Sequence, residues 1–145
     1  MTTVAQLLQE KGRAVWSIAP DATVYAALSL MAEKNVGALI VVEDARVVGI
    51  LSERDYARKV ILKGKFSKDT LVREIMTDQV YFLHPEQTIE ECMALMTAER
   101  VRHLPVLEDD QLVGIISIGD VVRVVISEKE FLIKQLEHYI TGRRG

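Results

Sequence analysis

The spacing of apolar and polar positions along this chain predicts the same succession of elements twice. Two short apolar runs, Val15–Ile18 and Val80–Leu83, predict strands. Each run is followed by a predicted helix, beginning at Thr23 and at Thr88, because apolar residues then recur at helical spacing. The sequence Thr-Ile-Glu-Glu from Thr88 predicts a capping box at the second of these helices. In the first helix the apolar positions are Val24, Ala27, Leu28 and Met31.

A predicted β-hairpin follows in each half, because two apolar runs are joined by a polar tetrapeptide. The first hairpin pairs Ala38–Val42 with Val47–Leu51, and the second pairs Leu104–Leu107 with Leu112–Ile116. A further helix is predicted after each hairpin, over Glu53–Lys63 with its end at Gly64, and over Gly119–Ile126. Each half is therefore a predicted β-α-β-β-α unit.

The two halves are an internal repeat. Shifting the chain by 65 residues places Val15–Val60 on Val80–Val125 without a gap, with 17 identities in 46 positions. One such unit leaves a sheet face that it cannot bury alone. The predicted fold class is therefore α/β, with mixed α+β sheets, in which two pseudo-twofold-related repeats pack sheet to sheet.

Short helices are expected before both repeats and a longer one after them. They are predicted over Val4–Glu10, ended by Gly12, over Leu71–Met76, and over the C-terminal Ser127–Thr141. In the last segment, Phe131, Leu132, Gln135, Leu136 and Tyr139 form a helical stripe, and Gly142 is a predicted cap. The predicted domains are residues 1–65, residues 66–127, and a C-terminal helix and tail at 128–145.

Composition narrows the class of protein. The 145 residues are 49% hydrophobic and 27% charged with a net charge of −3, which is typical of a soluble globular protein. No basic face is evident apart from a terminal Arg143–Arg144, so a nucleic-acid partner is not expected. The single cysteine, Cys92, excludes an internal disulfide and is expected to be a buried apolar residue. No apolar run approaches the roughly 20 residues of a membrane span, so we expect no membrane partner and a cytoplasmic location.

The junction after each hairpin carries the motif Gly-x-x-Ser-x-x-Asp, at Gly49–Asp55 and at Gly114–Asp120. One interpretation is a capping box without any ligand. The other is a nucleotide site, because free N–H groups at a helix start suit a phosphate. The Ser hydroxyl could donate to the ligand, the Asp carboxylate could accept from ribose hydroxyls, and the Gly could leave room for a ring. The occurrence of the motif twice, at matching places, favours a nucleotide.

With these motifs, the sequence resembles a tandem pair of cystathionine-β-synthase-type (CBS) domains, a Bateman module. The resemblance rests on Val72–Thr77, on Val101–Val106 and on both Gly-x-x-Ser-x-x-Asp junctions, and it covers about residues 2–127. It implies a non-enzymatic regulatory module that senses energy or redox state. The family binds AMP, ADP, ATP, NAD or S-adenosylmethionine, and some members bind nothing.

The resemblance also implies two clefts, each combining the Ser and Asp of one repeat with a wall of the other. One cleft would use Ser52, Arg54 and Asp55 with Leu83, Val101, Arg102, His103 and Pro105. The other would use Ser117, Gly119 and Asp120 with Ile18, Ala22, Val36, Gly37, Ala38 and Ile40. The first cleft collects Arg54 and Arg102, which favour phosphate. The sequence shows no matching cations for the Asp120 cleft.

Alternative functions differ in what they require. A hydrolase using Ser52, His103 and Asp55 is disfavoured, because no nucleophile elbow Gly-x-Ser-x-Gly occurs. A metal site is disfavoured, because His84, His103 and His138 are scattered. A ligand-free dimerisation or adaptor module remains the alternative, with intact Ser/Asp pairs weighing against it.

The expected partners are a second copy of the chain and a regulated protein, since the sequence shows no effector domain. The resemblance implies a homodimer formed through the helices beside the clefts. The helix residues expected there are Tyr56, Val60, Val121, Val122 and Val125. The C-terminal stripe would add apolar surface to the dimer, unless that helix folds back on its own module.

Overall fold

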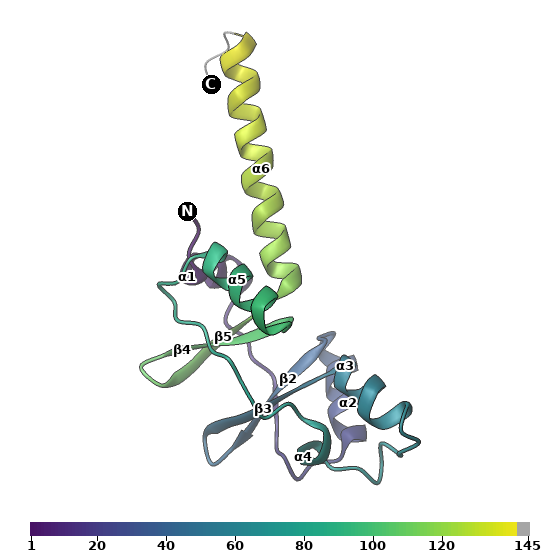
Figure 1. The fold of residues 1–145 in the computed structure, drawn as a ribbon. Helices are drawn as coiled ribbons and strands as arrows, with labels where there is room; N and C mark the ends of the chain where they lie inside the picture. Colours follow the sequence, from purple (N-terminus) through teal and green to yellow (C-terminus); the bar gives the residue numbers. More distant parts are fainter. Residues whose placement is uncertain (142–145) are drawn as a thin grey trace. The chain divides into compact units, whose positions relative to one another are not determined.

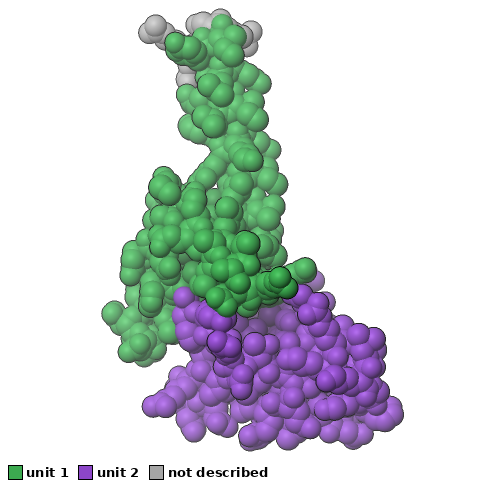
Figure 2. Space-filling model, in the orientation of Figure 1, with its two compact units in different colours: residues 1–13, 83–145 green, residues 14–82 purple. Residues whose placement is uncertain are grey.

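The computed structural model describes residues 1–141, and they form two compact units (Figure 2). Unit 1 combines residues 1–13 with the chain from Leu83 onward, and unit 2 is Ala14–Phe82. The predicted cap at Gly142 and the pair Arg143–Arg144 lie outside the described residues. The mixed α/β class predicted from the sequence is confirmed, with one small sheet in each unit.

Unit 2 contains the first repeat and a three-stranded sheet in the order β1-β2-β3 (Figure 1). Its elements are β1 (Ser17–Ile18), α2 (Val24–Lys34), β2 (Ala38–Glu43), β3 (Arg46–Ser52), α3 (Glu53–Tyr56), the π-helix η1 (Ala57–Ile61) and α4 (Val72–Ile75). Strand β1 runs parallel to β2, and β2 runs antiparallel to β3. The apolar stripe predicted for α2 is confirmed, since Val24, Ala27 and Met31 are buried and Leu28 is half-buried.

Unit 1 contains the second repeat, and its sheet has two strands (Figure 1). Its elements are α1 (Val4–Lys11), α5 (Ile89–Glu99), β4 (His103–Glu108), β5 (Gln111–Ser117) and α6 (Ile118–Thr141). The capping box predicted at Thr88 is confirmed, because Thr88 and Glu91 each accept the other's backbone N–H at 3.2 Å. Helices α1 and α5 and the β4–β5 hairpin form the core of this unit. Leu8, Cys92 and Ile116 are fully buried in it.

The strand predicted over Val80–Leu83 is wrong except at its last residue. Only Leu83 pairs, in a single parallel bridge to Val106. The next backbone N–H, that of His84, donates to the side chain of Gln87 at 2.7 Å instead of to a strand. Pro85 then has no N–H to offer, so the ladder stops there.

Each short helix joins the unit of the opposite repeat. Although α1 precedes the first repeat, its first N–H groups donate to Gln87 and Pro85 at 2.8 and 2.9 Å, in unit 1. Although α4 precedes the second repeat, its Val72 N–H donates to the Ala22 carbonyl at 2.8 Å, in unit 2. The predicted boundary between residues 65 and 66 therefore differs from the boundaries of the compact units. Carbonyl groups distant in sequence therefore satisfy the first N–H groups of both helices, in addition to the local cap between Thr3 and Gln6 at α1.

The hairpin turns are tighter than the predicted tetrapeptides. Only Asp44-Ala45 and Asp109-Asp110 lie between paired strands, and all four residues have φ between 50° and 63°. Such left-handed pairs match the right-handed twist of the strands they connect. The flanking polar residues, such as Glu43 and Arg46, therefore pair in the ladder.

Two helix predictions need correction. The helix predicted over Glu53–Lys63 changes to a π-helix at Ala57, where the Leu62 N–H reaches back to the Ala57 carbonyl at 3.2 Å. The separate C-terminal helix is part of α6, which runs unbroken from Ile118 to Thr141. No Pro or Gly occurs between Asp120 and Thr141, so nothing in the backbone ends the helix near Ser127.

The two motif glycines lie where a short helix packs against each hairpin. A Cβ at Gly114 would meet Leu8 of α1 at 2.7 Å, and one at Gly49 would meet Met76 at 2.7 Å and the Thr77 carbonyl at 3.0 Å. These glycines therefore allow close helix packing. This overturns the interpretation that they leave room for a ligand ring, because the space above each is already filled.

We expect Gly114→Ala to destabilise the protein by about 1–3 kcal/mol, because Leu8 is buried and cannot move aside freely. Gly119→Ala is the matched control, since its Cβ would meet nothing closer than 3.6 Å. Urea unfolding of both variants measures the difference. Replacing Leu8 by Ala in the Gly114→Ala background should recover part of the loss, and equal losses for the two glycine variants would contradict the packing role.

Candidate functional site

Both Gly-x-x-Ser-x-x-Asp junctions form complete capping boxes. The Asp55 N–H donates to the Ser52 hydroxyl at 3.2 Å, and the Ser52 N–H donates to the Asp55 carboxylate at 3.0 Å. The second copy repeats this geometry, with Asp120 to Ser117 at 3.2 Å and Ser117 to Asp120 at 2.8 Å. The capping boxes themselves are therefore confirmed, and a ligand at either junction would have to use the same atoms.

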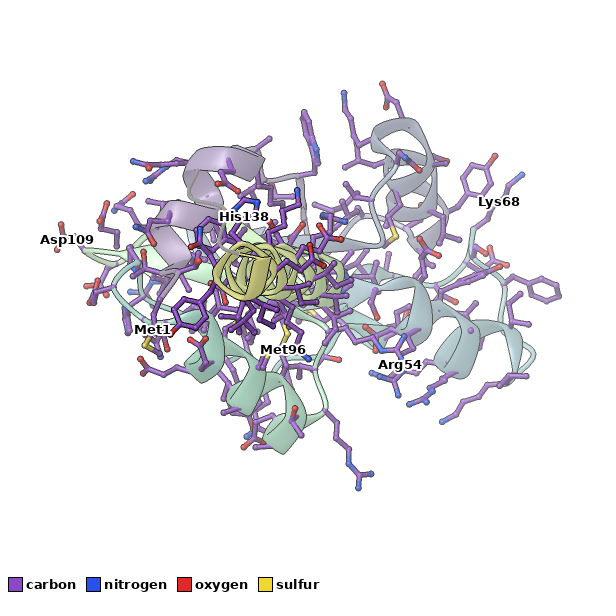
Figure 3. The ribbon with its side chains drawn as sticks, turned by 90° about the horizontal axis from the view of Figure 1, so that it is seen from above. Met1, Arg54, Lys68, Met96, Asp109 and His138 are labelled. Atoms are coloured by element: carbon purple, nitrogen blue, oxygen red, sulfur yellow. The ribbon has the colours of Figure 1, made fainter. Side chains whose placement is uncertain are left out.

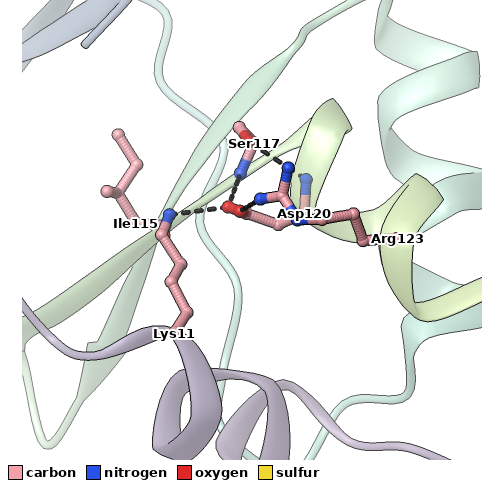
Figure 4. Close-up of polar contacts among 5 residues, drawn as sticks. All are labelled: Lys11, Ile115, Ser117, Asp120 and Arg123. Carbon is pink, nitrogen blue, oxygen red and sulfur yellow. Dashed lines mark hydrogen bonds and ion pairs between the residues drawn. The ribbon is translucent and has the colours of Figure 1, made fainter. Parts of the chain in front are cut away.

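In unit 1 the carboxylate of Asp120 lies at the centre of a polar cluster (Figure 4). Its Oδ2 atom accepts from Lys11 Nζ at 2.6 Å, and its Oδ1 atom accepts from Arg123 at 2.5 Å. Lys11 also donates to the Ile115 carbonyl at 2.6 Å, so its ammonium bridges α1 to β5 and to α6. Asp120 is 5% exposed, which makes these contacts the main compensation for its charge.

The electrostatics of this cluster favour a charged Asp120 and a neutral His103. Burial acts to raise the pKa of Asp120, but the hydrogen bonds from Lys11 and Ser117 outweigh it and hold the pKa below the ordinary 3.8. The pKa of His103 is lowered from 6.5, mainly by burial and then by Lys11. At neutral pH the site therefore presents cations and one neutral imidazole around a carboxylate.

The beginning of β4 lies beside the same helix start. His103 is the strand partner of Ser117, and the Ile118 N–H donates to the Arg102 carbonyl at 2.9 Å. Within unit 1, Lys11 and Arg123 therefore supply cations beside Asp120 that the sequence did not indicate. Lys11 comes from a helix more than a hundred residues away in sequence, and Arg123 from the next turn of α6, so neither occupies the position that corresponds to Arg54.

In unit 2 the carboxylate of Asp55 is held differently. Its Oδ1 atom accepts from the Thr77 hydroxyl at 3.2 Å and lies 3.1 Å from Lys59 Nζ. Its Oδ2 atom accepts from the N–H and hydroxyl of Ser52. Four donors thus use the approximately four acceptor positions of a carboxylate. Lys59 also donates to the Ile75 carbonyl at 3.0 Å, which joins α4 to the π-helix.

The predicted site residues divide between the units by repeat. Unit 2 holds Ile18, Ala22, Val36, Gly37, Ala38, Ile40, Ser52, Arg54 and Asp55, and unit 1 holds Leu83, Val101, Arg102, His103, Pro105, Ser117, Gly119 and Asp120. Both predicted clefts combine residues of the two units, so these combinations stay predictions. Within unit 2, Gly37 accepts the Glu53 N–H at 3.1 Å, as Arg102 does for Ile118 in unit 1.

Burial separates the predicted residues further. Four apolar ones are buried, which is typical of residues that pack in the core or line the wall of a closed cleft: Ala38, Ile40, Leu83 and Pro105. Arg54 is exposed and extends from α3 (Figure 3). Three residues that contact the capping carboxylates, Lys11, Lys59 and Thr77, were not among the site residues predicted from the sequence. Lys11 and Thr77 each lie at the end of the short helical segment that precedes a repeat. The only signal in the sequence was the capping Asp of each motif, because a buried carboxylate needs a cation or another donor nearby.

Unit 2 also contains a pocket of about 510 Å³ on the helical side of the unit. Its lining residues are Leu28, Met31, Ala32, Asn35, Val36, Gly37, Glu53 and Tyr56. The volume lies within the usual range for small-molecule sites. Val36 and Gly37 are the predicted site residues that line it, and neither Ser52 nor Asp55 does.

The structure also bears on the other sequence interpretations. Of the three residues of the disfavoured hydrolase triad, Ser52 and Asp55 lie in unit 2 and His103 lies in unit 1. Cys92 is fully buried, and its pKa is raised to about 11, mainly by burial and secondly by the charge of Asp120.

Among residues 1–141, no cluster of three or more His, Cys, Asp or Glu could hold a metal ion. Within that same range no helix has the length and apolar character required to span a membrane.

Two repeats, each with a hairpin followed by a helix that a Ser/Asp pair caps, define a tandem α/β module. The model of the CBS domain family matches residues 4–62 and again residues 72–127. The chain therefore belongs to the CBS domain family, and the resemblance found in its sequence is confirmed.

Known proteins of the family resemble the chain over most of its length. A CBS domain-containing protein of Arabidopsis thaliana, CBSX3, described as mitochondrial, is 41% identical over 97% of this chain and 73% of its own length. The crystal structure of the CBS domain NE2398 is 53% identical with a TM-score of 0.83, covering 86% of this chain and 98% of that one. The CBS domain pair of protein MJ0100, solved with 5-methylthioadenosine and S-adenosyl-L-methionine, has a TM-score of 0.77. Its 22% identity, over 88% of this chain and 98% of that one, shows a shared fold.

We expect Lys11→Met to destabilise the protein by about 1–3 kcal/mol at neutral pH, because Asp120 would keep its burial and lose one of its two cationic partners. The pKa of Asp120 is depressed in the folded state, so the stabilisation is present above its ordinary pKa of 3.8 and is lost as the pH falls through the lower folded value.

The loss caused by Lys11→Met should therefore be larger near pH 7 than near pH 3, where Asp120 becomes protonated. Urea unfolding at both pH values measures it. Lys63→Met, at an exposed lysine of unit 2, is the control and should change stability little at either pH. A loss of equal size at both pH values would mean that the Lys11 methylene groups, and not its charge, stabilise α1.

Proposed function

We propose that this chain is a regulatory module without catalytic activity that binds an adenine nucleotide or adenosyl compound, such as AMP, ADP, ATP or NAD. The ligand would lie against the Ser/Asp-capped helix starts, in clefts that combine residues of both repeats. The observation that carries the proposal is the cationic cluster at Asp120, where Lys11 and Arg123 flank a helix N-terminus. Cations beside the positive end of a helix dipole suit an anionic ligand.

Among the described residues, two cations, Lys11 and Arg123, contact Asp120, whereas Lys59 alone contacts Asp55. Arg102 is exposed next to the beginning of β4, and the resemblance assigns it to the cleft of Asp55. His103, neutral at pH 7, can accept from an adenine amino group or donate to a ring nitrogen. The pair solved with adenosyl ligands shares only the fold with this chain, so the argument rests on these local groups.

Ligand binding would require an exchange of hydrogen bonds at each carboxylate. At Asp120, a ribose hydroxyl could replace Lys11 or Arg123, and the freed cation could then meet a phosphate. At Asp55, a ribose hydroxyl would have to replace Thr77 or Lys59, because the other oxygen is used by Ser52. The cost of each exchange is offset only if the ligand satisfies the displaced group.

We expect Asp120→Asn to weaken the binding of AMP, ATP or NAD about 10- to 100-fold, because an amide accepts through one oxygen only. Asp55→Asn should do the same if its cleft is occupied, and the local cations lead us to expect the larger effect at Asp120. Calorimetric titration of the wild type and both variants measures this. If the wild type binds a ligand and both variants bind it with unchanged affinity, the two Asp residues are caps alone.

We expect Arg102→Ala to weaken ligands that carry phosphate about 10-fold while changing adenosine binding little, since a charged hydrogen bond to phosphate is removed. Arg54→Ala, at the exposed arginine of α3, is the paired variant, because the resemblance assigns both arginines to one cleft. Titration with AMP and with adenosine separates the two contributions. An equal loss for AMP and adenosine would assign Arg102 a structural role.

A ligand-free adaptor module is the second candidate, and one observation favours it. Both carboxylates are already fully compensated by side chains and N–H groups of their own unit. A thermal-shift panel of adenosyl compounds distinguishes the two functions. Stabilisation by at least one compound supports the sensor, and no shift with any of them supports the adaptor.

We further propose that the module is a homodimer that acts through another protein, in the cytoplasm. Two of the expected interface residues require correction, because Val60 and Val121 are buried at 0% and 1% exposure within their own units. Tyr56, Val122 and Val125 keep exposed surface and remain available for a partner. The Arabidopsis relative is described as mitochondrial, so cell fractionation is the direct test of location.

A further inference from the structure

Helix α6 continues well beyond the rest of unit 1 (Figure 1). It has 24 residues and is therefore about 36 Å long at ~1.5 Å per residue. Its first half packs on α1 and α5, and the Thr2 hydroxyl donates to Glu128 at 2.6 Å. From Lys129 to Ile140, every side chain except the half-buried His138 is exposed. The matching part of the family ends at residue 127, so this extension is an addition to the CBS pair.

One side of this helix is apolar. From Val122 onward, spacings of three, four and seven residues place all but one of its large exposed apolar side chains on a common face, and Figure 3 views the helix along its axis. The exception is Phe131, which is 65% exposed on the other side, so the stripe predicted from the sequence is wrong in including Phe131. The apolar face of α6 consists of Val122, Ile126, Leu132, Ile133, Leu136, Tyr139 and Ile140. Leu136 is 52% exposed and Tyr139 is 86% exposed, so the face has no cover from unit 1.

A helix of this kind needs a partner to be stable. Isolated helices are marginal in water, and most of their stability in proteins comes from packing an apolar face. The seven side chains, each about half exposed or more, offer an area on the order of the ~800 Å² that each partner buries in a standard interface.

The charges along the helix restrict what the partner can be. Between Val122 and Ile140, three basic residues are balanced by three acidic ones. An interfacial membrane helix is instead rich in Lys and Arg on its polar face. The balanced charges therefore favour another protein helix over a lipid surface.

We infer that the apolar face of α6 packs antiparallel against the same face of α6 in a second copy of this chain. Lys129 decides the direction, because it lies within the apolar face. Parallel packing would place two Lys129 side chains opposite each other. In antiparallel packing, Leu132 can lie opposite Ile133 of the second copy. This register places Lys129 opposite Leu136 and Ile126 opposite Tyr139. Each Lys129 stem can then cover apolar surface and extend its charge to water. The inference rests on the proposed homodimer and specifies its contact.

Sedimentation velocity of the full chain tests the contact. Leu132→Asp should raise the dimer dissociation constant about 10-fold or more, because it places a charge at the centre of the face. Lys134→Asp is the matched control, since it makes a change of similar kind on the polar side of the same turn. Unchanged dimerisation of Leu132→Asp, or an equal loss for both variants, would overturn the inference.

Cross-linking tests the direction. Lys129→Cys and Leu136→Cys chains, one carrying a size tag, are treated with a short bismaleimide separately and as a mixture. Antiparallel packing should give cross-links mainly between the two different variants, whereas parallel packing would give them within each variant and would overturn the proposal. The wild type is the control, because buried Cys92 should not react.

Two further readouts distinguish this inference from the ligand proposal and from membrane binding. Leu132→Asp should keep the wild-type ligand affinity, because residue 132 is remote from Asp120 along the helix. A dimer that binds no adenosyl compound would reject the ligand proposal and keep this one. Wild-type chain that sediments as a monomer but binds anionic phospholipid vesicles would reject the helix pair in favour of a lipid surface.

Discussion

A carboxylate at the start of a helix, satisfied by groups from several elements, is the interaction on which each unit depends. In unit 1, Asp120 closes the cap on Ser117 and receives Lys11 from α1. In unit 2, Asp55 closes the same cap and receives Thr77 and Lys59. Burying a charge without such partners costs several kcal/mol, so the short helix that supplies or positions the partner becomes part of the unit.

This arrangement links the proposed ligand chemistry to the position of the short helices. Helix α1 is attached to unit 1 through Leu8, which fills the space above Gly114, and through Lys11, which pairs with Asp120. A ligand that takes the place of Lys11 would remove this ion pair while leaving the Leu8 contact and the backbone hydrogen bonds of α1 to Gln87 and Pro85. In this way, binding at the capped helix could reach residues at the start of the chain without any change in the hairpin.

The C-terminal half of α6 is not stabilised by a capping carboxylate or by packing within its unit. Its stability cannot come from unit 1, because its large apolar side chains remain exposed. By contrast, Val60 and Val121, which have similar chemistry and also lie on helices, are buried within their own units. Apolar residues on a helix therefore do not identify an interface by themselves. An interface can be predicted from a helix only when it is known which face of that helix packs on the core of its own unit.

The sequence by itself determined the duplicated architecture, the helix starts at Thr23 and Thr88, both hairpins and both Ser/Asp caps, because each is encoded by residues within a few positions of one another. Only the tertiary structure decided which unit α1 and α4 join, that Lys11 serves Asp120, that the motif glycines accommodate Leu8 and Met76, and that α6 is continuous. The single pairing of Leu83 with Val106 likewise depended on a strand that is distant in sequence. The physical reason is range: caps and turns are local hydrogen-bond patterns, whereas the partners of a buried charge or a crowded glycine come from segments that only folding brings together.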